Sequence, residues 1–205
     1  PCRAHRAGPP PALAAMERLR PTDYRVMPWK NGGGTTRELW REPTDPALPF
    51  LWRVSMADVA SDGPFSAFAG YDRHIMTVKG GGMILTGGPH GPIEVFPPLV
   101  VRRFSGDWPI AARLRAGATT DFNLIARRGH ITSAMECFAP MDEVRWTVPT
   151  GETWFLHLLE GLLDGSPVAF RAGESLILRA GETVAWPAPA VVSHLVRCRL
   201  GTKTA

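Results

Sequence analysis

Short segments in which apolar and polar residues alternate run along most of the chain, and glycine or proline separates one segment from the next. In the segment 51–57, large apolar residues alternate with Arg53 and Ser55, so the two sets face opposite sides of an expected strand. A later segment alternates in the same way and carries Asp121 and Asn123 on its polar face. This period of two predicts strands with one apolar and one polar face.

Other apolar stretches predict further strands, at 74–78, 83–86, 93–96, 99–104, 153–160, 167–170, 173–178, 181–186 and 190–200. Three glycines at 80–82 separate the first two of these, which predicts that the two strands pair as a hairpin. Only 16–20 and 45–48 are expected to form single helical turns. So many strands in succession predict an all-β protein with few short helices, built as two β-barrels in tandem.

The chain is predicted to have three parts. Residues 1–15, rich in proline and alanine, are expected to form a flexible leader or to lie upstream of a natural start at Met16. They lack the ordered charge, apolar core and cleavage pattern of a signal peptide. One barrel is predicted over 16–128 and the second over 129–205.

Composition excludes several classes of partner. The net charge is +4 and the pI about 9.4, but the basic residues are mostly scattered arginines, so no nucleic-acid role is expected. No apolar run approaches the roughly 20 residues of a membrane helix, so no membrane role is expected either. The three cysteines are far apart in the sequence and show no paired spacing. This cysteine usage indicates a reducing cytoplasm rather than a disulfide framework.

The segment around a run of three consecutive glycines carries the most functional information. Trp29 offers an aromatic wall, and Asn31 can form hydrogen bonds through both ends of its amide. The glycines allow a ligand or another strand to approach the main chain, and Thr36 and Glu38 then share one face of the next strand. A plain glycine-rich hairpin between two structural strands explains the same residues. A phosphate loop does not, because no Gly-Lys-Ser/Thr sequence follows.

Four sequence blocks point to a family. They read PWKNGGGTTRE at 28–38, WRVS at 52–55, GPFS at 63–66 and TDFNL at 120–124, so the clear motifs all precede Arg128. Together they resemble the HutD/Ves family, and the resemblance extends over nearly the whole chain. It implies a bicupin fold in a cytoplasmic bacterial protein linked to histidine utilisation. The role that it implies is to bind a pathway intermediate and limit flux.

Nine residues are predicted to converge on one ligand site in the first barrel or between the two barrels: Trp29, Asn31, Thr36, Glu38, Arg53, Ser55, Arg73, Asp121 and Asn123. Arginine holds a carboxylate through two parallel hydrogen bonds. The expected occupant is therefore a small anionic metabolite such as formylglutamate, formiminoglutamate or urocanate. Two unpaired guanidinium groups would be costly to bury, which also favours an anion.

Structural roles for both arginines stay open. Arg53 fits an ion pair across strands with Asp121 or Glu38. Arg73 fits a turn-stabilising bond to Asp72 or to a backbone carbonyl equally well.

No metal or other cofactor is expected. The six histidines form no His-x-His pair with a nearby Glu, and His157, within a strand, is expected to be a core or surface histidine. No catalytic residue is assigned, because the chain lacks a Gly-x-Ser-x-Gly nucleophile elbow.

Three classes of function follow. The main hypothesis is a metal-free binding protein that regulates or buffers the pathway, and a homodimer is left open. The alternative is a metal-independent hydrolase or isomerase for a small carboxylate, with Glu38 and Asp121 as acid or base. A structural or partner-binding module would be favoured if side chains filled the predicted pocket.

Overall fold

The computed structural model describes residues 16–30 and 32–203, so the predicted leader at 1–15 lies outside the described residues. Within this part the chain is almost entirely β-structure, with one 3₁₀ turn, η1, at Pro21–Asp23. The prediction of an all-β protein is confirmed. Residues 45–48 form the expected single turn, closed by a bond of 3.2 Å from the Leu48 amide to the Asp45 carbonyl.

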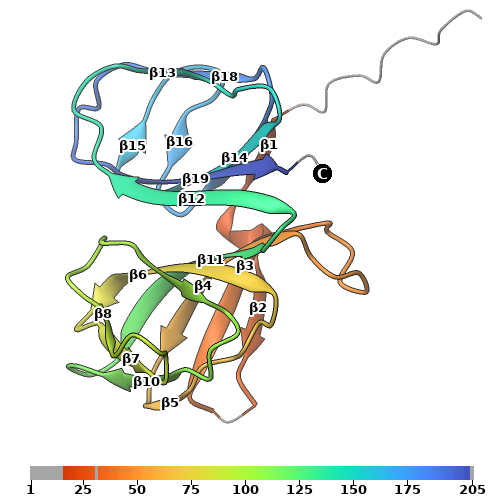
Figure 1. Ribbon diagram of the computed structural model, residues 1–205. Coiled ribbons are helices and arrows are strands. Elements are labelled where there is room, and N and C mark those ends of the chain that lie inside the picture. The colour runs from red at the N-terminus through yellow and green to blue at the C-terminus, as the bar shows by residue number, and fades with distance from the viewer. Residues whose placement is uncertain (1–15, 31, 204–205) are drawn as a thin grey trace, which may run out of the picture.

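The first half of the chain forms two facing sheets (Figure 1). The larger sheet contains β2 (Arg25–Pro28), β3 (Gly34–Glu42), β4 (Trp52–Val59), β6 (Tyr71–Gly80), β9 (Arg102–Ser105) and β11 (Thr119–Arg127). Its strand order is β2-β3-β4-β11-β6-β9. The smaller sheet contains β5 (Gly63–Pro64), β7 (Met83–Thr86), β8 (Ile93–Val95) and β10 (Ala111–Leu114). Its order is β5-β10-β7-β8, and all pairs are antiparallel.

The second half repeats this plan. Its large sheet contains β1 (Glu17–Leu19), β12 (Ile131–Phe138), β14 (Glu152–Glu160), β17 (Ser175–Arg179) and β19 (His194–Thr202), in the order β1-β17-β14-β19-β12. Two short ladders face it, formed by β13 (Val144–Thr147) with β18 (Thr183–Trp186) and by β15 (Leu162–Leu163) with β16 (Phe170–Arg171).

Strand β1 lies where a helical turn was predicted, and it belongs to the sheet of the second half. Residues 16–20 were expected to form a helical turn, but β1 pairs with β17 at the edge of the second large sheet (Figure 1). Arg18 anchors it through two bonds of 2.7 Å to the carboxylate of the buried Glu174. The start of the described chain therefore completes the second sheet before the chain enters the first.

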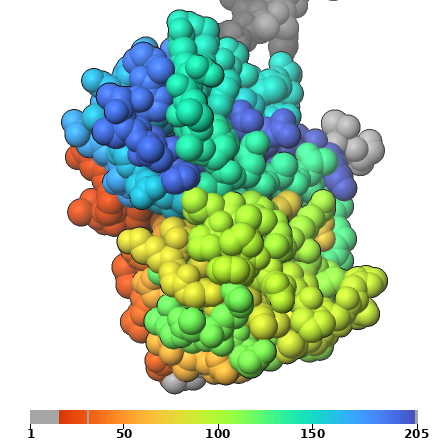
Figure 2. Space-filling model, turned by 90° about the vertical axis from the view of Figure 1, so that its left-hand side faces the viewer, coloured from red at the N-terminus to blue at the C-terminus, as the bar shows by residue number. Residues whose placement is uncertain are grey.

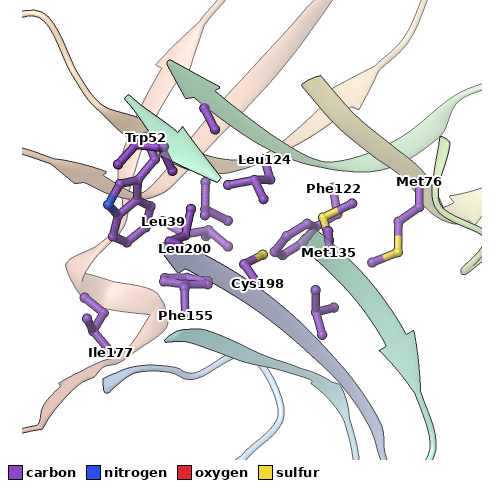
Figure 3. Packing of buried hydrophobic residues seen from close by; sticks show 14 residues of the cluster. Leu39, Trp52, Met76, Phe122, Leu124, Met135, Phe155, Ile177, Cys198 and Leu200 are labelled. Atoms are coloured by element: carbon purple, nitrogen blue, oxygen red, sulfur yellow. The ribbon is translucent and has the colours of Figure 1, made fainter. Parts of the chain in front are cut away.

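The two large sheets pack face to face and form the central core of the molecule. Figure 3 shows Trp52, Leu39 and Leu124 of the first half beside Phe155 and Leu200 of the second. The rings of Trp52 and Phe155 meet edge to face, with centroids 6.3 Å apart. Each large side chain buried in this way contributes about 2 kcal/mol by leaving water. The two halves are consequently joined by a continuous apolar layer, and the space-filling view shows them in close contact (Figure 2).

The predicted alternation along two central strands is confirmed. On β4, Trp52 and Val54 enter the central core, while Arg53 and Ser55 face the interior of the first barrel. On β11, Phe122 and Leu124 enter the same core. Asp121, Asn123 and Ile125 alternate with them and face the barrel interior.

The predicted hairpin of 74–78 with 83–86 is wrong. Strands β6 and β7 belong to different sheets, and β7 pairs with β8 and β10 instead. Gly80 and Gly82 have φ values of +88° and +77°, which turn the chain from one sheet to the sheet that faces it. A Cβ at Gly80 would collide with the carbonyl of Ala118. The glycines therefore serve a crossover between sheets.

Sequence analysis predicted no strand at β5, β10, β12, β13 or β15. Strand β12 is the edge of its sheet and carries small or half-buried residues at several positions, which weakens its apolar pattern. Among the residues that the structure describes, no helix is long and apolar enough to cross a membrane.

Two buried histidines lie where the halves meet. His157 bonds Ser175 Oγ through Nδ1 at 2.9 Å and lies 5.6 Å from the ring of Phe122, so it is the core histidine that the sequence allowed. His74 on β6 reaches Ser133 Oγ on β12 at 3.0 Å. Burial, with a nearby arginine in each case, lowers the pKa of His157 to about 3 and that of His74 to about 4.

We expect acid to weaken the fold through these histidines. The unfolded chain takes up their protons below about pH 6.5, whereas the folded chain does so only near the lowered pKa values. Stability is therefore complete above about pH 6.5 and is lost as pH falls, by up to about 1.4 kcal/mol per pH unit and group. Urea unfolding of His157→Asn at about pH 7 and about pH 5 should show a smaller loss than the original chain. His130→Asn, at an exposed position, is the matched control and should lose as much as the original chain.

Candidate functional site

The interior of the first barrel contains a cavity of about 440 Å³. It is lined by Trp29, Lys30, Thr36, Arg53, Ser55, Ala57, Pro64, Phe65, Ser66, Phe68, Arg73, Asp121, Asn123 and Ile125. Seven of the nine predicted site residues are in this set. Glu38 contacts the cavity only through Arg53, and Asn31 lies outside the described residues.

Strand register brings these side chains together. Because alternate residues share a face, neighbours in adjacent strands form rows across the barrel-facing side of the large sheet. The rows are Arg53–Ile125–Arg73, Ser55–Asn123 and Thr36–Ala57–Asp121. The polar groups thus come from β3, β4, β6 and β11, which are far apart in the sequence.

The glycine-rich turn forms one wall of the cavity. The Trp29 amide donates to the Gly34 carbonyl at 2.9 Å, and the indole Nε1 donates to Thr36 Oγ1 at 2.8 Å. Gly34 is required by a close approach, since a Cβ there would collide with the carbonyl of Asp58. The segment is therefore a tight turn between β2 and β3, which is the plain hairpin considered from the sequence. It also places Trp29 against the cavity as the aromatic wall considered there.

Arg73 is held in place by the protein itself. Only 5% of it is exposed, its Nη2 donates to Asn123 Oδ1 at 2.8 Å, and its Nη1 donates to the Ser66 carbonyl at 3.1 Å. Three rings surround the guanidinium with centroids 5.0–5.4 Å away, those of Phe65, Phe68 and Phe104. Of the two structural roles considered for Arg73, the bond to a backbone carbonyl is the one observed.

Arg53 is only partly engaged. Its Nε donates to Glu38 Oε2 at 2.6 Å. Of the two ion-pair partners considered for Arg53 from the sequence, Glu38 and Asp121, the structure shows Glu38. Its terminal nitrogens form no hydrogen bond within the described part of the chain, although Arg53 lines the cavity. Arg53 can therefore still present a planar pair of donors to an occupant.

Asp121 lines the cavity and is fully buried. Its Oδ1 accepts a hydrogen bond from Asn123 Nδ2, and its Oδ2 has no partner among residues 16–30 and 32–203. Burial raises the pKa of Asp121 to about 7, and the charge of Arg73 and the Asn123 bond oppose this rise. Burial likewise lowers the pKa of Arg73 to about 10, against the attraction of Asp121.

These pairings correct one step of the sequence argument. The two arginines were expected to be unpaired, so that an anion would be needed to balance them. In the structure Glu38 pairs with Arg53, and Asp121 shares the buried region with Arg73. The arginines alone thus do not demand an anionic occupant, and the free edge of Arg53 becomes the relevant feature.

Several cavity residues were not assigned from the sequence. Lys30 and the aromatic Phe65 and Phe68 line the cavity, and Ser66 supplies the carbonyl that holds Arg73. The signal for most of them was present, since Phe65 and Ser66 lie within one of the family-like sequence blocks. Strand periodicity could not find them, because they follow the short strand β5 in an irregular segment.

The corresponding region of the second barrel is filled by side chains. Trp154, Phe170 and Trp186 pack in its interior. Arg197 lies 4.3 Å from the ring centre of Trp146 and donates to Glu136 at 2.8 Å. No group of three or more His, Cys, Asp or Glu side chains that could hold a metal ion occurs in the described ranges of either barrel.

Tandem β-barrels with a polar cavity in one of them define a cupin-type protein. The fold likeness agrees, since the bacterial pirin YhhW from Escherichia coli superposes with a TM-score of 0.65 over 90% of this chain and 98% of its own. At 8% identity this likeness shows the fold alone. The predicted bicupin fold class is confirmed.

The chain belongs to the HutD family, whose model matches residues 21–197. HutD from Pseudomonas fluorescens SBW25, in a structure described as a formate condition, is 27% identical with a TM-score of 0.76, and the match covers 93% of this chain and 100% of that one. A conserved protein of unknown function from Pseudomonas aeruginosa PAO1 is 29% identical with a TM-score of 0.80, covering 92% and 100%. The resemblance seen in the sequence is confirmed.

Curated relatives match over part of their length. An uncharacterized 21.2 kDa protein in the hutC 3′ region of Pseudomonas putida is 42% identical over 115 residues, which is 55% of this chain. Protein Ves of Cronobacter sakazakii is 37% identical over 112 residues, or 52% of this chain. In both cases the chain spans 59% of the relative's length.

We expect Arg73→Lys to destabilise the fold by about 2 kcal/mol, because one ammonium group cannot keep both hydrogen bonds and the planar packing against three rings. Urea unfolding at constant pH measures the change. Arg103→Lys provides the matched control, since Arg103 is exposed and pairs with Asp72 at the surface, and it should change stability by less than about 0.5 kcal/mol. Equal effects of the two substitutions would contradict a structural role for Arg73.

Proposed function

We propose that this HutD-family protein binds a small carboxylate metabolite of histidine degradation in the cavity of the first barrel. It acts in the cytoplasm, where it regulates or buffers the pathway by holding that intermediate. Family membership and the relative in a hutC region support the pathway. The observation that carries the binding role is the guanidinium of Arg53, which lines the cavity with its terminal nitrogens unengaged by described residues.

The chemistry around Arg53 suits a carboxylate. Glu38 holds the Nε side of the guanidinium, which orients the remaining planar edge for two parallel hydrogen bonds. The hydroxyl of Ser55 lies in the next row of the same face, and Lys30 adds a positive charge to the lining. Trp29 and Phe65 offer apolar surface to the rest of an occupant.

The cavity volume agrees with a small metabolite. Sites for small organic ligands range from about 300 to 1,000 Å³, and this cavity of about 440 Å³ lies near the lower end. Formylglutamate, formiminoglutamate and urocanate are compact carboxylates of this scale. A pocket filled by side chains would have favoured a purely structural module, and this cavity is not filled.

We expect calorimetric titration to detect binding of at least one of these three carboxylates. Arg53→Lys should weaken that binding about tenfold or more, because lysine retains the charge beside Glu38 but loses the planar pair of donors. Arg103→Lys, at the surface, should bind as the original chain does. Unchanged affinity in Arg53→Lys would remove Arg53 from the site, and absence of binding by all three ligands would overturn the proposed function.

For the enzyme alternative, Asp121 is the one of the two acid–base candidates that is still available for catalysis. Glu38 is occupied by Arg53, whereas Asp121 Oδ2 has no partner in the described residues. Proton NMR of each ligand after prolonged incubation with the protein distinguishes the two functions. A regulator or buffer leaves every ligand intact, and an enzyme converts one of them at a rate that Asp121→Asn lowers.

A further inference from the structure

The lining of the cavity includes a carboxyl group whose hydrogen bonding is incomplete. Asp121 is fully buried, and one of its two oxygens has no partner in the described residues. An ionised carboxylate has about four acceptor sites and is costly to bury when they are unfilled. The neutral acid has the opposite need, since its hydroxyl must find an acceptor. Either form leaves one unmet requirement at a residue that lines the cavity.

Nearby cations do not meet this requirement. The Nη groups of Arg73 bond Asn123 and the Ser66 carbonyl, and its Nε has no partner in the described residues, so no hydrogen bond joins the guanidinium to Asp121. Asn123 stands between them, accepting from Arg73 through its oxygen and donating to Asp121 Oδ1 through its nitrogen. Both ends of the Asn123 amide are thereby used, and Oδ2 keeps no partner among the described residues.

We propose that Asp121 binds the ligand as a neutral acid, donating Oδ2–H to an acceptor oxygen of the bound carboxylate metabolite. This inference rests on the proposed function and adds to it that ligand binding is coupled to proton uptake. Arg53 then binds one carboxylate of the occupant, and Asp121 donates a hydrogen bond to the same occupant. The two residues belong to different rows of the sheet. A neutral Asp121 also avoids placing a second buried negative charge beside the ligand.

The cations around Asp121 favour its ionised form, whereas a bound anion shifts the balance of charge towards the neutral acid. Asp121 shares the cavity with Arg53 on β4, Arg73 on β6 and Lys30 on the turn, and Glu38 on β3 pairs with Arg53. Burial and the charge of Asp58 raise the pKa of Asp121 to about 7 before any ligand is present. A bound anion adds a further repulsion to the ionised form, so binding draws a proton onto Asp121.

The test uses the whole protein with N-formylglutamate and formate as probes, because neither probe changes its charge between about pH 5.5 and pH 8.5. In the original chain the dissociation constant should rise about tenfold per pH unit above about pH 7. Calorimetry at about pH 8 in two buffers with different ionisation enthalpies should show uptake of close to one proton per bound probe.

Asp121→Asn provides the decisive variant, since its amide nitrogen can donate at every pH. It should bind with nearly the low-pH affinity of the original chain and show no pH dependence. Asp142→Asn, at an exposed position, is the matched control and should keep the pH dependence of the original chain. Proton counting on the original chain tests the inference even where Asp121→Asn does not fold.

The outcomes separate the two proposals. Binding of a probe with no proton uptake, or with affinity that rises with pH, overturns the role of Asp121 and leaves the proposed function standing. For N-formylglutamate the second of these results would mean that its amide N–H donates to an ionised Asp121. Binding of neither probe at any pH overturns this inference, and the proposed function falls with it if formiminoglutamate and urocanate also fail to bind.

Discussion

Strands β4 and β11 are buried on both faces, and the two faces meet opposite physical demands. One face packs Trp52 and Phe122 into the apolar layer between the halves, where any unpaired polar group would be costly. The other face carries Arg53 and Asp121 into a cavity, where polar groups are tolerated because they pair or meet an occupant. A slip of one residue in either strand would exchange the two sets, so the central core fixes the register of the site.

Side-chain volume distinguishes the interiors of the two barrels. Each half places an arginine against three aromatic rings, Arg73 in the first and Arg197 in the second. In the first half the guanidinium of Arg73 donates hydrogen bonds to Asn123 and to the Ser66 carbonyl, which hold it in the wall of the barrel. In the second half tryptophans fill the interior.

Sequence patterns predicted most of the fold and of the cavity, and their errors have identifiable causes. Period-two alternation located β4 and β11 together with the faces of their side chains, because the pleat requires it. The glycines at 80–82 indicated a turn but not its destination, and the chain crosses to another sheet there. Strand β1 joins a strand more than 150 residues away, and no local pattern reports such a pairing.

By itself, the sequence determined that the chain forms strands, which face of each central strand is polar, and which family it belongs to, since these depend on local periodicity and on short motifs. Tertiary structure alone decided which polar groups pair. It placed Glu38 against Arg53, tied Arg73 to Asn123 and left one oxygen of Asp121 without a described partner. The physical reason is that hydrogen bonding and desolvation depend on neighbours brought together across strands, and those neighbours are distant in the sequence.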